Sequence, residues 1–223
     1  MILPTSITTE LAEETGWHIG DGSMNFYDNG GSVRGIYQLR GHMEDDRSHY
    51  IERIKPIFKR LYNIDISLRE MPSTRVFGFQ IWDSNLVNFK KKLGLPLGKK
   101  FTVDIPKAFL EDEELLKAVI RGIFDTDGGT YLWKRYGKLY PRMSIATISY
   151  PLSKQLVSGL IKLGIRATCY PEFRPHLPNS QTAYYVMIRG EEMFHKFMKE
   201  INPQNQKHQN KYKKFLDSKK AYK

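Results

Sequence analysis

One short pattern occurs twice in this chain, each time at the end of a segment that is expected to be helical. The copies are residues 16–22 (GWHIGDG) and residues 122–128 (GIFDTDG), and about half the chain separates them. Small residues stand four positions apart in each copy, and an Asp-Gly pair ends it. Residues four apart share one face of a helix, so two such helices can approach until their backbones touch. The repeat therefore predicts two similar halves that pack together through these helices.

Hydrophobic periodicity and turn residues predict the same order of elements in both halves: helix, two strands, helix, two strands, helix. The first half contains a helix from Thr8 or Thr9 to Gly22, strands over 24–27, 33–42, 66–69 and 76–82, and helices over 46–62 and 85–93. The second half contains helices over 111–126, 152–163 and 192–201, and strands within 130–148, 166–173 and 183–188. The predicted fold class is therefore α+β, with two pseudo-symmetric αββαββα repeats and antiparallel sheets.

Glycine and proline between residues 94 and 98 mark a joint between the halves. We therefore divide the chain into a first repeat (1–94), a linker (95–105), a second repeat (106–204) and a basic C-terminal tail (205–223). The tail has seven lysines and one aspartate from Gln206 onward. This composition is typical of a short basic helix or an arm that lies against phosphates, and equally of a solvated tail.

The composition narrows the class of partner. The formal net charge is +11 and the isoelectric point is about 9.6, which favours a polyanion: nucleic acid first, an anionic membrane surface second. No transmembrane span or signal peptide is evident, so we expect no membrane partner. Cys169 is the single cysteine, which excludes an internal disulfide framework and a cysteine-rich zinc site. It suits a reducing, intracellular compartment.

The two Asp-Gly ends are candidates for a metal site. If the helices pack side by side, Asp21 and Asp127 come within reach of one cation. A cation is favoured there because two carboxylates at adjacent helix C-termini otherwise repel each other. Oxygen ligands favour Mg²⁺, with Mn²⁺ as a substitute. The carbonyls of Gly20 and Thr126 could add coordination. The alternative interpretation is that Asp-Gly is an ordinary turn dipeptide in both places.

Residues 11–22 and 120–128 resemble the two signature helices of LAGLIDADG homing endonucleases in their single-chain, two-repeat form. The stretch 98–106, together with 121–128, is most similar to the archaeal intron- and intein-associated branch. Residues 15–19 and 121–124 depart from the literal signature, but the final acidic residue is present in both copies. Asp125 matches Ile19 in the first copy, so we expect a capping or structural role for it. We expect His18 to be a packed histidine.

The resemblance implies a site-specific endonuclease that makes a metal-dependent double-strand cut in a long, asymmetric DNA target. Asp21 and Asp127 would each serve one scissile phosphate. The resemblance also implies a lysine late in each repeat, for which Lys100 (or its neighbour Lys99) and Lys207 are candidates. One chain would act as a monomer on double-stranded DNA. The alternatives are an intron RNA maturase on the same scaffold and a nuclease-dead DNA-binding protein.

Strand alternation separates side chains that face the core from side chains that can face DNA. Arginine, glutamine and asparagine read base edges in the major groove, whereas lysine mostly meets phosphates. Two sheets end to end would span about 60 Å, or roughly 18 base pairs. The other interpretation is a solvated strand face. The candidate DNA-binding residues are Asn25, Tyr27, Arg34, Gln38, Arg40, His42, Arg69, Arg75, Gln80, Trp82, Lys134, Tyr136, Lys138, Arg142, Ser144, Arg174 and Arg189.

Overall fold

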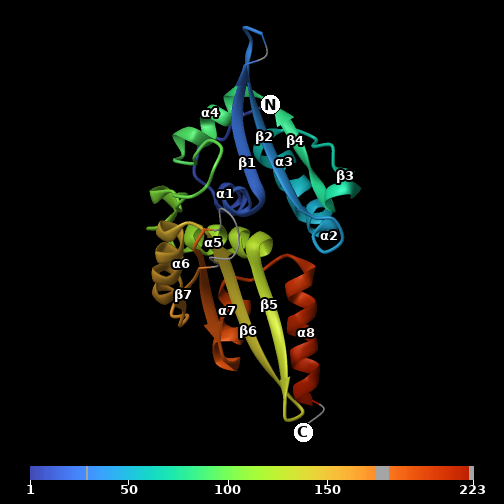
Figure 1. Ribbon diagram of the computed structural model, residues 1–223, viewed down its shortest axis with the longest axis vertical. Helices are drawn as coiled ribbons and strands as arrows, with labels where there is room; N and C mark the ends of the chain where they lie inside the picture. Colours follow the sequence, from blue (N-terminus) through green and yellow to red (C-terminus); the bar gives the residue numbers. More distant parts are fainter. Residues whose placement is uncertain (29, 174–180, 221–223) are drawn as a thin grey trace.

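Two four-stranded antiparallel sheets extend in opposite directions from a central pair of helices (Figure 1). The computed structural model describes residues 1–28, 30–173 and 181–220. Within these residues no helix has the length and apolar character needed to cross a membrane. The two-repeat α+β architecture predicted from the sequence is confirmed.

The first repeat follows the predicted order, and its sheet has the strand order β1-β2-β4-β3. A π-helical turn over Tyr50–Ile54 precedes α3, in whose first turn Pro56 lies. The helix expected over 46–62 is therefore interrupted before α3, because proline has no N–H to continue the helical ladder. The elements are α1 (Thr9–Asp21), β1 (Gly22–Asp28), β2 (Val33–His42), α2 (Arg47–His49), α3 (Lys55–Tyr62), β3 (Arg69–Met71), β4 (Val76–Trp82) and α4 (Ser84–Lys92).

The second repeat has the equivalent strand order, β5-β6-β8-β7. It carries one further helix, α8, which forms most of the basic tail. The elements are α5 (Glu113–Asp127), β5 (Gly128–Arg135), β6 (Lys138–Thr147), α6 (Tyr150–Lys162), β7 (Thr168–Glu172), β8 (Ala183–Arg189), α7 (Glu191–Glu200) and α8 (Gln206–Lys220).

The central pair consists of α1 and α5, which touch through glycine. A Cβ added to Gly16 would lie 2.9 Å from the Cα of Gly122, and a Cβ added to Gly122 would lie 2.9 Å from the Cα of Gly16. Gly20 faces Thr126 in the next turn, where a Cβ would overlap the threonine side chain. The predicted approach of the two backbones is therefore confirmed.

Charged side chains also join the repeats beside this contact. Glu13 of α1 is buried and accepts two hydrogen bonds from Arg53, of 2.9 and 2.8 Å. Arg121 of α5 donates to the same carboxylate at 3.1 Å. A buried carboxylate is costly unless it is paired. Two guanidinium groups, one from each repeat, meet that need.

The first core holds a second buried ion pair. Glu14 of α1 pairs with Lys90 of α4, and neither side chain is exposed to solvent. The hydroxyls of Tyr37 and Tyr62 donate to the same carboxylate at 2.7 and 3.0 Å. The charge is thus hydrogen-bonded on several sides, as a buried charge requires.

The linker and the tail are parts of the packed structure. Leu95, Val103 and Ile105 of the linker are buried, and the Gly98 N–H donates to the Met24 carbonyl of β1 at 2.9 Å. Helix α8 buries His208 and Phe215 against the second repeat. Most of the tail is therefore a helix, which was one of the predicted alternatives. One side of this helix packs against the second repeat.

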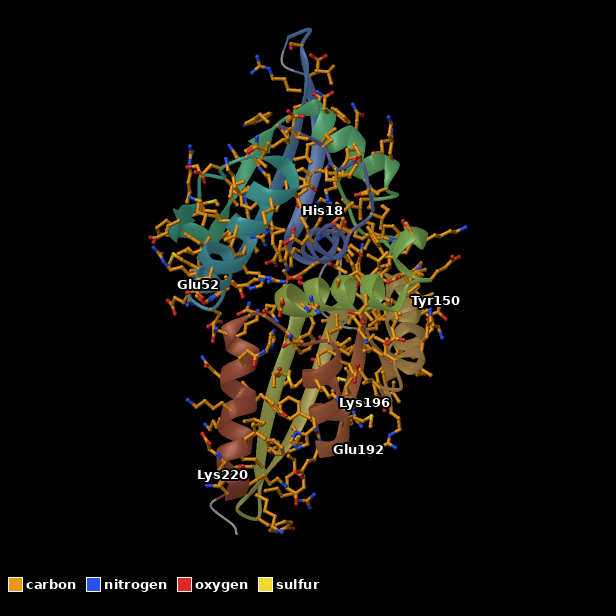
Figure 2. The ribbon with its side chains drawn as sticks, turned by 180° about the vertical axis from the view of Figure 1, so that it is seen from behind. His18, Glu52, Tyr150, Glu192, Lys196 and Lys220 are labelled. Atoms are coloured by element: carbon orange, nitrogen blue, oxygen red, sulfur yellow. The ribbon has the colours of Figure 1, made fainter. Side chains whose placement is uncertain are left out.

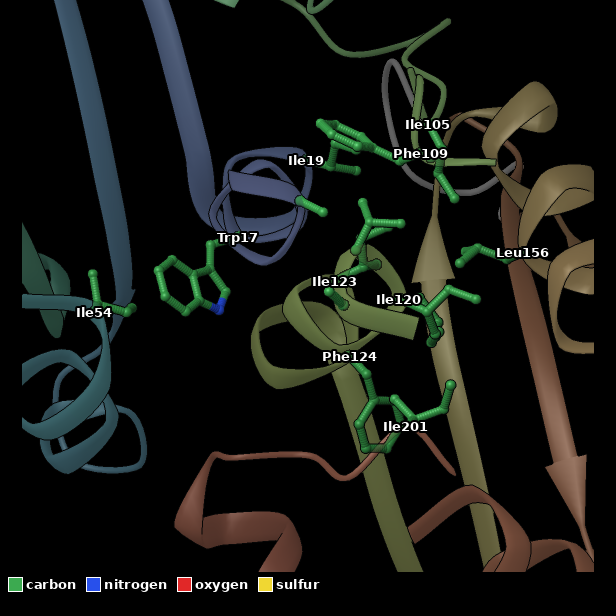
Figure 3. Packing of buried hydrophobic residues seen from close by; sticks show 14 of the residues in the cluster. Trp17, Ile19, Ile54, Ile105, Phe109, Ile120, Ile123, Phe124, Leu156 and Ile201 are labelled. Atoms are coloured by element: carbon green, nitrogen blue, oxygen red, sulfur yellow. The ribbon is translucent and has the colours of Figure 1, made fainter. Parts of the chain in front are cut away.

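Apolar side chains from both repeats and from the linker gather around the helix pair (Figure 3). Trp17 and Ile19 come from α1, and Ile123 from α5. Ile105 and Phe109 approach from the segment that joins the repeats. The cluster is continuous across the α1–α5 contact. The two repeats therefore share one hydrophobic core.

We predict that Gly16→Ala destabilises the protein, although Gly→Ala inside a helix normally stabilises by about 1 kcal/mol. The added Cβ would meet the backbone of α5, including the Val119 carbonyl, which cannot move aside like a flexible side chain. We expect the free energy of unfolding, measured by urea titration, to fall by about 2 kcal/mol or more. The control is Lys91→Ala on the exposed face of α4, expected within about 0.5 kcal/mol of wild type. Equal stability of the two variants would contradict the close contact.

Candidate functional site

Asp21 and Asp127 are the last residues of the two central helices. The next residue in each case is a glycine that begins a strand, and its N–H still bonds the helix, to His18 and Phe124 respectively. A Cβ at either glycine would collide with the backbone of the preceding helix turn. The Asp-Gly spacing therefore fixes each carboxyl group at a sharp junction between helix and strand.

The two carboxyl groups lie close to one another. A Cβ added to Gly20, next to Asp21, would lie 3.3 Å from the carboxyl carbon of Asp127. The hydroxyl of Tyr50 donates to Asp21 at 3.3 Å. The structure thus brings together the two acidic residues that the sequence singled out.

Crowding by protein atoms and mutual repulsion make these carboxyl groups hard to ionise. Burial raises the pKa of Asp21 to about 8, and the charges of Asp127 and Asp46 contribute in the same direction. Burial raises the pKa of Asp127 to about 6, while Lys100 and Lys207 oppose the shift. Asp127 keeps exposed surface, so its shift reflects dense protein on one side of the carboxyl group.

The two predicted lysines lie at the ends of the same two helices. Lys100 donates to the carbonyls of Ile19 at 2.8 Å, His18 at 3.3 Å and Gly20. Burial lowers the pKa of Lys100. Lys207 lies 3.4 Å from the Thr126 carbonyl. Each lysine therefore faces the carbonyl end of the motif helix of its own repeat, where a cation is favoured.

The remaining predicted contacts near this centre have clear positions. Lys99, the alternative to Lys100, lies over the ring of Phe101 at 5.4 Å. The carbonyls of Gly20 and Thr126, predicted as additional metal ligands, accept hydrogen bonds from Lys100 and Lys207. A carbonyl oxygen has two lone pairs, so this contact leaves one acceptor position on each.

The donor set fits a hard divalent cation that keeps part of its coordination for substrate. Asp21 and Asp127 offer carboxylate oxygens at one point. No group of three or more His, Cys, Asp or Glu side chains suited to a metal occurs within residues 1–28, 30–173 and 181–220. Mg²⁺ is typically held by one or two carboxylates together with substrate phosphates and water. The residues present match that pattern better than a closed structural site.

Asp46 is a buried carboxylate at this centre that the sequence analysis missed. It accepts hydrogen bonds from the His42 N–H at 2.8 Å and from the Asn205 side chain at 2.7 Å. It also pairs with Lys207 at 2.8 Å. No carboxylate occupies residues 148–152, which follow the equivalent strand of the second repeat. The surroundings of the two motif aspartates are therefore unequal.

Two other residues of the motif helices have the structural roles that were predicted. Asp125 is fully buried and accepts from the N–H groups of Gln204 at 3.0 Å and Asn205 at 3.1 Å. It thereby fixes the segment that leads to Lys207. His18 is buried and stacks on Tyr37 with ring centroids 5.1 Å apart, and burial lowers its pKa to about 3.

The predicted contact residues of the first repeat share one face of their sheet. Residues paired directly across strands point to the same side. Register pairs Tyr27 with Arg34 and Gln38 with Gln80. Gly78 pairs with both Arg40 and Arg69. We call this the first open face; its predicted members are Asn25, Tyr27, Arg34, Gln38, Arg40, His42, Arg69, Gln80 and Trp82.

Arg75 lies beside this face rather than on it. It occupies a turn with a φ of 54° and forms an ion pair with Glu44 at 3.7 Å. Because Arg75 lies in the turn between Met71 and Val76, strand alternation does not assign it to either face of the sheet.

In the second repeat, Lys138, Arg142, Ser144 and Arg189 share the corresponding second open face. The predicted placement of Lys134 on the same face is wrong. The hairpin pairs Arg135 with Lys138 and leaves Lys134 opposite Leu139, so Lys134 points to the opposite face. A shift of one residue reverses the face of every side chain in a strand.

Tyr136, another predicted residue, lies outside the strands. Tyr136 is 85% exposed in the hairpin turn, with a φ of 50°. Arg174 lies outside the described residues. The register places on the second open face further residues that were not predicted: Tyr131, Trp133, Arg135, Tyr140, Thr168 and Tyr170. The alternation of Tyr131, Trp133 and Arg135 is the sequence signal for the first three of these.

Comparisons with known proteins agree with this architecture. Residues 114–202 match the model of a LAGLIDADG-like domain. A structure of mesophilic variants of the homing endonuclease I-DmoI has a TM-score of 0.62 at 16% identity, covering 86% of this chain and 95% of that chain. The crystal structure of I-DmoI in complex with DNA and Ca has a TM-score of 0.61 at 16% identity, covering 86% of each chain.

The LAGLIDADG meganuclease I-AabMI bound to uncleaved DNA has a TM-score of 0.59 at 13% identity, covering 96% of this chain and 93% of that chain. No curated protein gave a match. At these identities the structural likeness shows the fold. The chain has the two-repeat α+β fold of LAGLIDADG meganucleases, and the match to the LAGLIDADG-like domain model lies in its second repeat.

Proposed function

We propose that this protein is a site-specific homing endonuclease that makes a metal-dependent double-strand cut in a long DNA target. The observation that carries the proposal is the pair Asp21 and Asp127, adjacent at the ends of two touching helices. The similar structures support it, because I-DmoI and I-AabMI were crystallised with DNA. From residues 98–106 and 121–128 we place the chain nearest the archaeal intron- and intein-associated branch.

A divalent cation bound by Asp21, Asp127 and DNA phosphate oxygens would supply Lewis-acid chemistry and an activated water. We propose Mg²⁺, with Mn²⁺ as a substitute; crystal structures of I-DmoI variants in complex with DNA were determined in the presence of Mn or Mg. The two aspartates would orient this chemistry at one phosphate in each strand. Lys100 and Lys207 would stabilise negative charge that develops on the phosphate.

Double-stranded DNA is the proposed substrate because both open faces carry arginine and other polar side chains and the chain is strongly basic. Both sheets begin directly at the candidate centre, at Gly22 and Gly128, and extend away from it in opposite directions (Figure 1). The two faces carry different side chains, so we infer an asymmetric target of roughly 18 base pairs. Since one chain provides both carboxyl groups, we propose that it acts as a monomer.

Cleavage is tested with supercoiled plasmids that carry genomic or random inserts, incubated with Mg²⁺. We predict that the wild type linearises some of them and that Asp21→Asn or Asp127→Asn slows double-strand cleavage by about a hundredfold or more. The control is Asp65→Asn, an exposed carboxyl group that pairs with Lys55 and has no contact with the candidate centre among the contacts described.

Cutting that persists in both variants would contradict the catalytic assignment. Tight, sequence-specific binding of DNA without any cutting by the wild type would favour the nuclease-dead alternative. Binding confined to structured intron RNA would favour the maturase alternative.

A second prediction concerns the ionisation of Asp21. Its pKa of about 8 in the folded chain exceeds its ordinary value of 3.8, so without metal the folded state loses stability as pH rises from about 4 to about 8. Asp21→Asn removes this cost and can still accept from Tyr50. Without divalent metal, we expect the melting temperature of the variant to exceed that of the wild type near pH 8.5. The difference in melting temperature should shrink near pH 5.

Mg²⁺ should raise the melting temperature of the wild type and leave that of Asp21→Asn nearly unchanged, because a ligand stabilises only a state that binds it. Melting of the variant at or below wild type near pH 8.5 would contradict the crowding at this carboxyl group.

A third prediction concerns base readout by Arg40 on the first open face. A guanidinium that bonds a guanine distinguishes it from other bases by about 1–3 kcal/mol. We expect Arg40→Ala to lose discrimination at one base pair in a selection from randomised DNA, with other positions kept. Lys91→Ala on α4 is the control. An unchanged base preference would remove Arg40 from the contacts.

A further inference from the structure

Tyr50 is a buried tyrosine whose hydroxyl group reaches the candidate centre. Its side chain is closed off from solvent, and its ring packs edge-on against Phe77 with ring centroids 5.9 Å apart. The hydroxyl donates to Oδ2 of Asp21 at 3.3 Å. Because a close-packed core restricts a buried ring, the core of the first repeat fixes the position of this hydroxyl group.

The backbone at Tyr50 departs from a regular helix. Tyr50 is the first residue of the π-helical turn over Tyr50–Ile54, and its carbonyl accepts from the N–H of Lys55. Single π-helical turns inside α-helices are rare and are frequent at functional sites. Helix α6, which follows the equivalent hairpin of the second repeat, is α-helical from Tyr150 to Lys162. The equivalent helix of the second repeat therefore lacks this turn.

Gly41 of β2 leaves the space in which the side chains around Tyr50 meet. A Cβ added to Gly41 would lie 2.8 Å from Oδ2 of Asp21 and 2.9 Å from Oδ2 of Asp46. The same Cβ would lie 2.9 Å from the ring of Tyr50. The two carboxyl groups thus approach one point, where like charges repel. The His42 N–H holds the oxygen of Asp46 at 2.8 Å, and the Tyr50 hydroxyl holds that of Asp21.

These contacts decide which oxygen of Asp21 is left for a ligand. The hydroxyl of Tyr50 and the space at Gly41 both lie at Oδ2, which leaves Oδ1 for a cation. Mg²⁺ demands near-ideal octahedral geometry, so a carboxylate that binds it must present its oxygen in a fixed direction. A hydrogen bond to a ligating carboxylate supplies that orientation, and its loss typically costs about 10–100-fold in metal affinity or activity.

We propose that Tyr50 is a positioning residue for Asp21: its hydroxyl holds Oδ2 so that Oδ1 is presented to a divalent cation. This role rests on the proposed metal-dependent function and adds a residue that the sequence analysis did not identify. It concerns Asp21 alone, because among the described residues no hydroxyl group donates to Asp127. The alternative is that Tyr50 only fills the core and that its hydroxyl has no effect on the metal.

Tyr50→Phe tests this role because it removes one hydroxyl group and keeps the ring. The matched control is Tyr62→Phe. Tyr62 is also fully buried in the first repeat and donates to a buried carboxylate, Glu14, at 3.0 Å. Glu14 keeps its contacts with Tyr37 and Lys90 in that variant, so we expect both variants to fold.

The first measurement is the binding of Mn²⁺ alone to the full chain near pH 8.5, followed by the electron paramagnetic resonance signal of the unbound ion. We expect Tyr50→Phe to raise the dissociation constant for Mn²⁺ about tenfold or more, and Tyr62→Phe to change it less than about twofold. Mg²⁺ should also raise the melting temperature of Tyr62→Phe by more than that of Tyr50→Phe.

The second measurement uses a plasmid that the wild type cuts. The Mg²⁺ concentration needed for half-maximal cleavage should rise in Tyr50→Phe by the same factor, and excess Mg²⁺ should restore most of the wild-type rate. Damage to the fold would instead lower the rate at every Mg²⁺ concentration and would contradict a positioning role.

Equal Mn²⁺ affinity of Tyr50→Phe and the wild type would overturn the proposal, as would an equal loss of affinity in Tyr62→Phe. Absence of Mn²⁺ binding by the wild type would overturn it as well. Weaker Mn²⁺ binding in Tyr50→Phe alone, with every plasmid left uncut by the wild type, would support the role of Tyr50 and contradict the proposed nuclease activity. The two failures are therefore distinguishable.

Discussion

The contact between Gly16 and Gly122 is the constraint on which the rest of the structure depends. Because no side chain separates α1 from α5, the ends of the two helices stand side by side. Asp21 and Asp127 are then adjacent, and β1 and β5 begin at one place. Viewed from behind, the same pair lies between the two sheets, with His18 on α1 near the centre (Figure 2). The position of the candidate site therefore follows from the packing of small residues.

This arrangement gathers negative charge, and the structure shows how the charge is balanced. Two helix C-termini and three carboxyl groups meet in a small volume. Lys100 and Lys207 enter from the segments that follow each repeat and bond to helix carbonyls. The linker and the tail are thus parts of the centre. Their backbones are fixed by packing and by acceptors such as Asp125.

Much of the fold could be predicted from the sequence because its signals are local. Helix faces follow from spacing over four residues, and strand faces follow from alternation. Asp21 and Asp127 meet because a repeated motif must fold the same way twice, whereas Lys100 and Lys207 were predicted only through the family resemblance. Lys134 was placed on the wrong face because the register of its hairpin depends on the turn at Tyr136 and Gly137. Asp46 could not be predicted because its partners, Asn205 and Lys207, are distant in sequence.

The buried link between Asp46 and Lys207 makes the two halves of the centre chemically different. Lys207 shares its charge with a carboxylate, whereas Lys100 is bound only to main-chain oxygens among the contacts described. A lysine held by an anion offers less of its charge to a phosphate than one held by neutral dipoles. Under the proposed function, the two halves of the centre would therefore cleave their DNA strands at different rates. A nicked duplex would then persist until the slower half has cut its strand.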